Sequence, residues 1–162
     1  MSISPKEEPA GNSGPSKKKS EEPGQFSISL DCISDFEFRI SFDDTQYPDI
    51  TTDEPAPVGS DKGPNPSRLL AAAVGGCLSA SLLFSARKLR LNTAGLHTKV
   101  RVRQTRNEKG RLRIGKIEVE ISPDIVEPDE KKLQRCLELF EDFCVVTQSV
   151  RNGIDVSVNV TS

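Results

Sequence analysis

Apolar and polar residues alternate with a period of two from residue 26 onward. Apolar side chains stand at positions 26, 28, 30 and 32, and again at 36, 38, 40 and 42. Such alternation places every apolar side chain on one face of a β-strand. The pattern predicts two half-buried antiparallel strands that turn at Ser34-Asp35, with Cys32 as a buried structural residue. A short third strand is expected between Tyr47 and Thr52.

Residues 63 to 90 predict one long helix. Asn65 can cap it, and Pro66 suits the first helical position because its missing N–H has no partner there. The following side chains are apolar or small almost all the way round, with no charge between Arg68 and Arg87. A helix without a polar face is a buried one. Its apolar run is too short for a membrane span, so we expect a soluble central helix of about 25 residues.

The second half of the chain predicts two further strands, two helices and a last strand. The strands cover 98–105 and 111–121, and apolar positions in the second change from even to odd numbers at Gly115. One extra residue there keeps them on one face, so we expect a β-bulge. Helical patterns follow over 128–152, and alternation returns at 154–160. The order predicts an α+β fold with an antiparallel sheet around the buried helix.

The connection from residue 43 to 64 is rich in turn residues. A loop of this length in a compact domain is often functional. Asp53-Glu54 could therefore supply a carboxylate to a site. We favour the simpler interpretation, in which both are solvated turn residues.

Composition and charge narrow the possible functions. The 162 residues suit one domain (25–162), preceded by a disordered polar tail (1–24) rich in Pro, Gly, Ser, Lys and Glu. The net charge of −2 gives no general attraction to nucleic acid or to an anionic membrane. Five arginines between 101 and 113 lack interleaved aromatic residues, which favours a solvated strand face over a nucleic-acid site. The start lacks an apolar signal segment, so we expect a cytoplasmic protein.

Four cysteines are too few for a secreted disulfide scaffold of this length. They form no CxxC pair, and the one histidine, His97, cannot complete a zinc finger. Cys136 is expected to pack in the core. Cys77 lies among small residues of the central helix, and Cys144 lies near the start of a late helix, where the helix dipole favours a thiolate and Asp142 opposes it. Their spacing alone leaves open whether they pack or react.

Two motifs resemble the OsmC/Ohr family of osmotically induced and organic hydroperoxide resistance proteins. The first runs from Pro64 to Cys77, and the second from Phe143 to Val150. The likeness extends from about Phe26 to Val160, and the motifs stand at the family's relative spacing.

The resemblance implies an intertwined homodimer with two sites at the subunit interface. It further implies a thiol-dependent peroxidase without metal, haem or other cofactor. Cys77 would be the peroxidatic residue and Cys144 the resolving one, with a dithiol or lipoyl group as reductant. An apolar pocket would favour small organic hydroperoxides, in oxidative or osmotic stress defence.

This chain departs from the family's pattern at two places. Ser67 stands where the peroxidases carry a glutamate, and no arginine lies between Ile40 and Ser67 to hold the thiolate. Arg68 is out of phase with Cys77 on the helix, which leaves Arg39, supplied by a dimer partner, as an outside candidate. The alternative is a non-catalytic dimer that binds a small apolar ligand at its interface.

Overall fold

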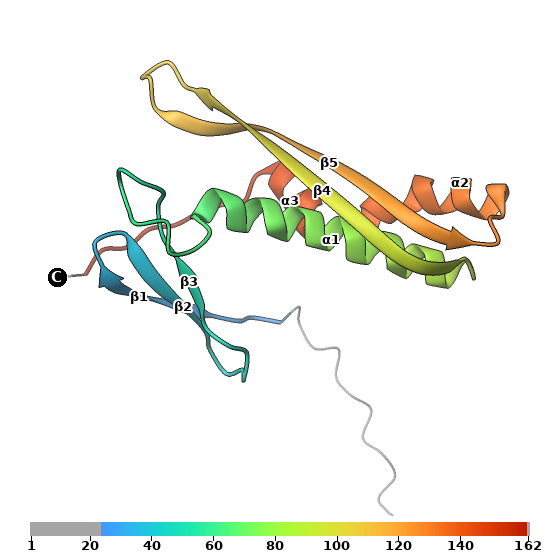
Figure 1. Cartoon of the computed structure of the whole chain (residues 1–162), viewed down its shortest axis with the longest axis horizontal. Coiled ribbons are helices and arrows are strands. Elements are labelled where there is room, and N and C mark those ends of the chain that lie inside the picture. The colour runs from blue at the N-terminus through green and yellow to red at the C-terminus, as the bar shows by residue number, and fades with distance from the viewer. Residues whose placement is uncertain (1–23, 162) are drawn as a thin grey trace, which may run out of the picture.

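The computed structural model describes residues 24–161, so the predicted polar tail lies outside it except for residue 24. The protomer combines a small sheet, a long helix, a long hairpin and short helices (Figure 1). In chain order the elements are β1 (Ile28–Ser34), β2 (Glu37–Phe42), β3 (Ile50–Thr52), α1 (Pro66–Lys88), β4 (Asn92–Arg106), β5 (Leu112–Val126), α2 (Glu130–Leu139), the 3-10 helix η1 (Phe140–Phe143) and α3 (Val145–Asn152). The α+β class and the long central helix are as predicted.

Helix α1 begins where the sequence indicated. The Asn65 side chain accepts a hydrogen bond from the Arg68 amide at 3.1 Å, and Pro66 is the first helical residue. One side of the helix packs against β4, β5, η1 and α3. The approach to β4 is closest at Gly75, where an added Cβ would lie 2.5 Å from Val100 Cγ2. A glycine is therefore required at this crossing.

The opposite side of α1 is exposed within the single chain. Ala72, Gly76, Ala80 and Phe84, spaced four residues apart, form an open stripe of mostly small residues. By length and composition alone α1 could cross a membrane. In this fold it is the core helix, and its buried side carries Val74, Leu78 and Leu82.

Strands β4 and β5 form one long antiparallel hairpin that lies along α1 (Figure 1). The predicted bulge is confirmed: Arg103 pairs with Lys116 and Gln104 with Ile114, so Gly115 is the extra residue. An added Cβ at Gly115 would lie 2.7 Å from Thr105 Cγ2. The bulge keeps the half-buried isoleucines and valine of β5 on the side of α1.

The outer face of this hairpin carries paired charges. Arg101 lies 2.9 Å from Glu120, and Arg103 lies 3.7 Å from Glu118. These ion pairs match the expected solvated strand face.

The N-terminal hairpin and β3 form a separate three-stranded antiparallel sheet near the start of α1 (Figure 1). Ile28 pairs with Phe42 and Cys32 with Phe38, so the predicted antiparallel hairpin is confirmed, with its turn at Asp35-Phe36, one residue later than expected. The expected burial is wrong for this chain by itself, because all seven residues of β1, Cys32 included, are exposed. No other described element packs broadly on this sheet. Ile40 of β2 is buried at 8% exposure, but the β1 part of the apolar face has no cover within the described protomer.

The predicted last strand at 154–160 is not formed in this chain. Its apolar residues remain largely exposed, from 65% at Ile154 to 88% at Val160. Alternation alone cannot make a strand, because a strand needs a neighbour to satisfy its backbone groups. The described part of the protomer offers this segment no paired strand.

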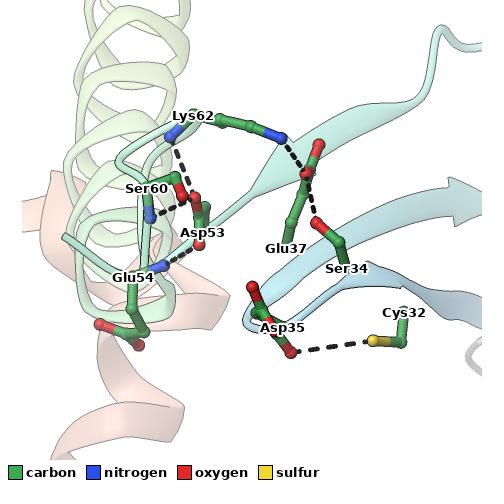
Figure 2. A network of polar contacts seen from close by, with 8 residues as sticks. All are labelled: Cys32, Ser34, Asp35, Glu37, Asp53, Glu54, Ser60 and Lys62. Atoms are coloured by element: carbon green, nitrogen blue, oxygen red, sulfur yellow. Dashed lines mark hydrogen bonds and ion pairs between the residues drawn. The ribbon is translucent and has the colours of Figure 1, made fainter. Parts of the chain in front are cut away.

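Asp53 organises the loop before α1 (Figure 2). Its carboxylate accepts hydrogen bonds from the amides of Glu54, Ser60 and Lys62 at 2.8, 3.0 and 3.2 Å. With 1% exposure, Asp53 is not the solvated residue that we expected. Burial raises its pKa, but the three amide donors outweigh that effect, and the net pKa lies below the ordinary value.

Candidate functional site

Helices α1 and α3 bring Cys77 and Cys144 together. Cys77 lies in the fourth turn of α1, and Cys144 directly precedes α3. Cys144 belongs to a buried cluster with Val74 and Leu78, and Cys77 packs against it. Cys144 has no exposed surface and Cys77 is half-buried, and both are free thiols. A pair 67 residues apart in the sequence thus becomes one local cluster.

Contacts between η1 and α1 fix the position of Cys144. The ring of Phe143 meets that of Phe84 edge to face, with 5.3 Å between their centres. The Lys88 ammonium lies over both rings, 5.9 Å from the centre of Phe84 and 5.3 Å from that of Phe143. These contacts hold the end of η1 on α1, so the next residue, Cys144, points into the cluster.

Cys144 is the N-cap of α3, and its sulfur lies among hydrogen-bond donors. The Thr147 amide donates to Cys144 Sγ at 3.4 Å, and the Cys144 thiol donates to Thr147 Oγ1 at 3.0 Å. Ser81 on α1 also acts on it. Burial raises the pKa of the Cys144 thiol, but hydrogen bonds from Cys77, Thr147 and Ser81 outweigh this, and the net pKa is lowered.

The pKa of the Cys77 thiol is shifted the other way. Burial raises it most, and the neighbouring Cys144 adds to the rise. The amides of Val146 and Thr147 at the start of α3 oppose the rise without cancelling it. Among the described groups that set this pKa most strongly, none is a cation. Cys77 is thus more exposed but less acidic than its neighbour.

The basic residues weighed from the sequence are engaged elsewhere in the protomer. Arg39 lies on β2, 3.6 Å from Asp31 and 3.7 Å from Asp49. Lys62 forms an ion pair with Glu37 at 2.7 Å, visible in Figure 2.

Arg68, at the start of α1, lies 3.7 Å from Asp61. The structure therefore brings the two cysteines together and leaves Arg39 in the N-terminal sheet. Arg39 of a dimer partner stays a prediction.

A largely apolar cavity of about 480 Å³ lies between α1, β5 and the C-terminal helices. Its walls include Leu78, Val119 and Phe140, and an ion pair of 2.7 Å joins Glu141 and Arg151 at its lining. Neither thiol lines it. Thr147, Val74 and Leu78 do, and all three also contact or pack with Cys144, so the cavity borders the cluster that holds this cysteine.

Sequence reasoning missed the roles of Thr147 and Ser81. Thr147 stands three residues after Cys144, which is the spacing at which an N-cap side chain meets a backbone amide of its helix. That spacing was a readable signal. Ser81 stands one helical turn after Cys77, but nothing in the sequence distinguishes it from the other small residues of α1. No cluster of three or more metal-ligating side chains exists among residues 24–161.

Comparisons with known proteins agree with this arrangement. The sequence model of the OsmC-like protein family matches residues 59–159, which include both cysteines. No curated protein matches the sequence.

Several solved structures share the fold. An OsmC-like protein of unknown function from Vibrio cholerae superposes with a TM-score of 0.68 at 16% identity, covering 78% of this chain and 94% of that one. An organic hydroperoxide resistance protein from Elizabethkingia anophelis superposes with a TM-score of 0.59 at 18% identity, covering 83% of this chain and 94% of that one. The organic hydroperoxide resistance protein OhrB of Bacillus subtilis superposes with a TM-score of 0.52 at 20% identity, covering 80% of this chain and 94% of that one. With the family's sequence pattern spanning more than half of its length, this chain belongs to the OsmC-like family.

Proposed function

We propose that the chain is a thiol-dependent peroxidase that reduces small organic hydroperoxides in the cytoplasm, in defence against oxidative or osmotic stress. The observation that carries this proposal is the contact between Cys77 and Cys144. The names of two structural relatives, organic hydroperoxide resistance proteins, agree with it.

Each thiol has the exposure that its proposed role needs. The Cys77 sulfur attacks the O–O bond, becomes a sulfenic acid and releases an alcohol. Cys144 then attacks the sulfenic sulfur, and a Cys77–Cys144 disulfide forms with loss of water. An external dithiol or lipoyl group reduces the disulfide by exchange. Only Cys77, the half-buried member, can meet a substrate from outside, while buried Cys144 is protected from direct oxidation.

The active form in this proposal is a homodimer. Three apolar surfaces lack cover in the protomer: the β1 face, the open stripe of α1 and the segment 154–160. A partner copy would cover them and is the source from which Arg39 could reach Cys77. Uncovered apolar surface of this extent is typical of subunit interfaces.

Steady-state assays with tert-butyl hydroperoxide and dihydrolipoamide test the function. Wild type is expected to turn over, whereas Cys77→Ser and Cys144→Ser lose activity because each lacks one half of the disulfide. Cys136→Ser is the matched control, since Cys136 lies in a different buried cluster from Cys144, and it should retain full activity. Equal rates in wild type, Cys77→Ser and Cys144→Ser contradict the proposal.

A second candidate is a binding module with packing cysteines. The apolar cavity favours it, because no thiol lines the cavity. This candidate predicts that peroxide treatment leaves no Cys77–Cys144 disulfide in the mass spectrum. It also predicts that apolar ligands bind equally well to wild type and to Cys77→Ser.

A further inference from the structure

We propose that Cys144 is also the base that receives the Cys77 proton during attack on the hydroperoxide, and that Thr147 is the residue that positions it for this task. This inference rests on the proposed peroxidase function and adds a step that precedes disulfide formation.

The first argument is the placement of donors around Cys144. Thr147 presents both its hydroxyl, 3.0 Å from Cys144 Sγ, and its amide, 3.4 Å away. Ser81 adds a contact from α1, and the helix α3 begins at the next residue. A hydroxyl can turn to donate to a thiolate, and amides at a helix start favour negative charge. The fully buried sulfur is thus surrounded by groups that stabilise its anion.

The second argument is the asymmetry of the pair. The Thr147 amide donates to Cys144 Sγ at 3.4 Å and Cys144 caps α3, whereas the main influence on Cys77 is burial, which raises the pKa of its thiol. In the proposed proton transfer the pair loses its first proton from Cys144, and the Cys77 thiol, which packs against the same cluster, is the group that then transfers its proton to it. A thiol hydrogen-bonded to a thiolate is already aligned for proton transfer.

Other charged groups do not account for this arrangement. On α1 the titratable group that faces Cys144 is Cys77. On η1, Glu141 is paired with Arg151 of α3, and Asp142 is exposed. On β5, Lys116 and Glu118 pair with each other at 2.7 Å. Within residues 24–161, the groups acting most strongly on Cys144 are neutral donors.

The proposed proton transfer from Cys77 to Cys144, called the relay below, would activate the Cys77 thiol in place of the glutamate and arginine that this chain lacks at the family's positions. Ser67 replaces the glutamate, and among residues 24–161 no arginine is one of the groups that act most strongly on Cys77. Without a cation, a partly buried thiol stays protonated and reacts slowly. Cys144 as an adjacent base would speed the reaction without a prior Cys77 thiolate, because it takes the Cys77 proton while the S–O bond forms.

The proposed step balances as follows. The Cys77 proton moves to the Cys144 thiolate while the Cys77 sulfur attacks the terminal oxygen of ROOH and the O–O bond breaks. The Cys144 thiol then protonates the departing alkoxide, which gives ROH and restores the Cys144 thiolate. That thiolate attacks the Cys77 sulfenic sulfur, forms the disulfide and expels hydroxide. One two-electron reduction of the peroxide matches one two-electron oxidation of the two sulfurs.

The decisive experiment measures the first step by itself. Rapid mixing of the reduced protein with tert-butyl hydroperoxide at pH 7, followed by mass spectrometry, gives the rate at which Cys77 is oxidised. A purely resolving Cys144 acts later, so Cys144→Ser would leave this rate unchanged. As a base it contributes roughly 100-fold, so Cys144→Ser should lower the rate by about that factor. Cys136→Ser, another buried cysteine that donates to the Leu82 carbonyl, is the matched control and should react at the wild-type rate.

Thr147 variants separate positioning from packing. Thr147→Val removes the hydroxyl at nearly constant shape, so the pH at which Cys77 oxidation reaches half its maximal rate should rise. Thr147→Ser should restore the wild-type profile. A lower rate without any shift in the pH profile contradicts the positioning role.

Site-specific titration makes the relay testable even without peroxide turnover. The ¹³Cβ NMR shifts of the four cysteines report each thiolate separately, and Cys144 should ionise at lower pH than Cys77. Ionisation of Cys77 first, or an unchanged first-step rate in Cys144→Ser, overturns the relay. A wild-type protein that peroxide does not oxidise contradicts the peroxidase function instead, and the titration then decides the thiolate's position independently.

Discussion

A few hydrogen-bond donors lower the pKa of individual buried residues in this protein. Asp53 and Cys144 are both almost fully buried, and burial opposes a charge on either of them. In each case nearby donors outweigh that effect: those of Asp53 come from its own loop, whereas those of Cys144 come from Thr147 of α3 and from Cys77 and Ser81 of α1. Nearby hydrogen-bond donors, rather than distant ion pairs, are therefore the main influence that lowers both pKa values.

Asp53 gives a pH prediction at this scale. Its pKa is lowered in the folded state, so its contribution to stability is complete above its unfolded-state pKa and is lost as pH falls through the lower folded-state value. Stability should therefore fall below about pH 4, where an unperturbed Asp takes up its proton. Asp53→Asn should weaken this acid dependence, because the amide cannot lose or gain that proton.

Urea unfolding between pH 2.5 and 7 measures the effect. Asp44→Asn is the control, since Asp44 lies exposed in the loop after β2. An identical acid dependence for wild type and Asp53→Asn would contradict the prediction.

At the scale of elements, helix α1 combines two faces of opposite character. The Gly75 side meets β4 at close range, and the hydroxyls of Ser79 and Thr98 lie 2.6 Å apart beside that crossing. The Gly76 side has no atom within 4 Å of an added Cβ. Neighbouring glycines in one helix therefore have different structural roles.

Alanine substitutions test the tight crossing at Gly75. Gly75→Ala should destabilise the protein by about 1–3 kcal/mol, because the new methyl group would lie 2.5 Å from Val100. Gly95→Ala is the control, because Gly95 lies exposed on β4 with no atom within 4 Å of an added Cβ, and it should be neutral or stabilising by up to about 1 kcal/mol. Denaturant unfolding of both variants gives the comparison. Similar losses at the two positions would show that the crossing at Gly75 is not the tight one.

Features with a local signal were predictable at this scale. The cap at Asn65 and the bulge at Gly115 follow from residues within a few positions of each other, and both are confirmed. The burial of Asp53 was missed because its donors stand up to nine residues later in a loop without periodicity. The donors around Cys144 were missed for a related reason, because Ser81 approaches from another helix.

At the scale of the whole molecule, the protomer leaves apolar surface exposed and a segment unpaired, where a compact domain would bury and pair them. The two sheets remain separate, and the segment 154–160 extends without a partner past the N-terminal sheet (Figure 1). The strand predicted here from alternation is not formed, because a strand needs a paired neighbour and the alternation of one segment does not specify which chain or sheet would pair with it. The apolar face of β1 was predictable, whereas its missing cover was not.

The homodimer predicts opposite effects of neighbouring substitutions in this segment. Val156→Lys places a charge on the apolar side and should shift the protein from dimer to monomer. Ser157→Lys adds the same charge on the polar side and should leave the dimer intact. Light scattering coupled to size-exclusion chromatography measures both masses. Equal masses for the two variants would exclude this segment from the interface.

The open stripe of Ala72, Gly76 and Ala80 on α1 has a consequence for the protein's lifetime. If association is what shields this stripe, folding and self-association are one equilibrium, and the melting temperature should climb as the sample is concentrated. Scarce copies would then be short-lived and exposed to proteases, whereas a burst of synthesis would protect its own products. Abundance itself would act as a stabilising factor.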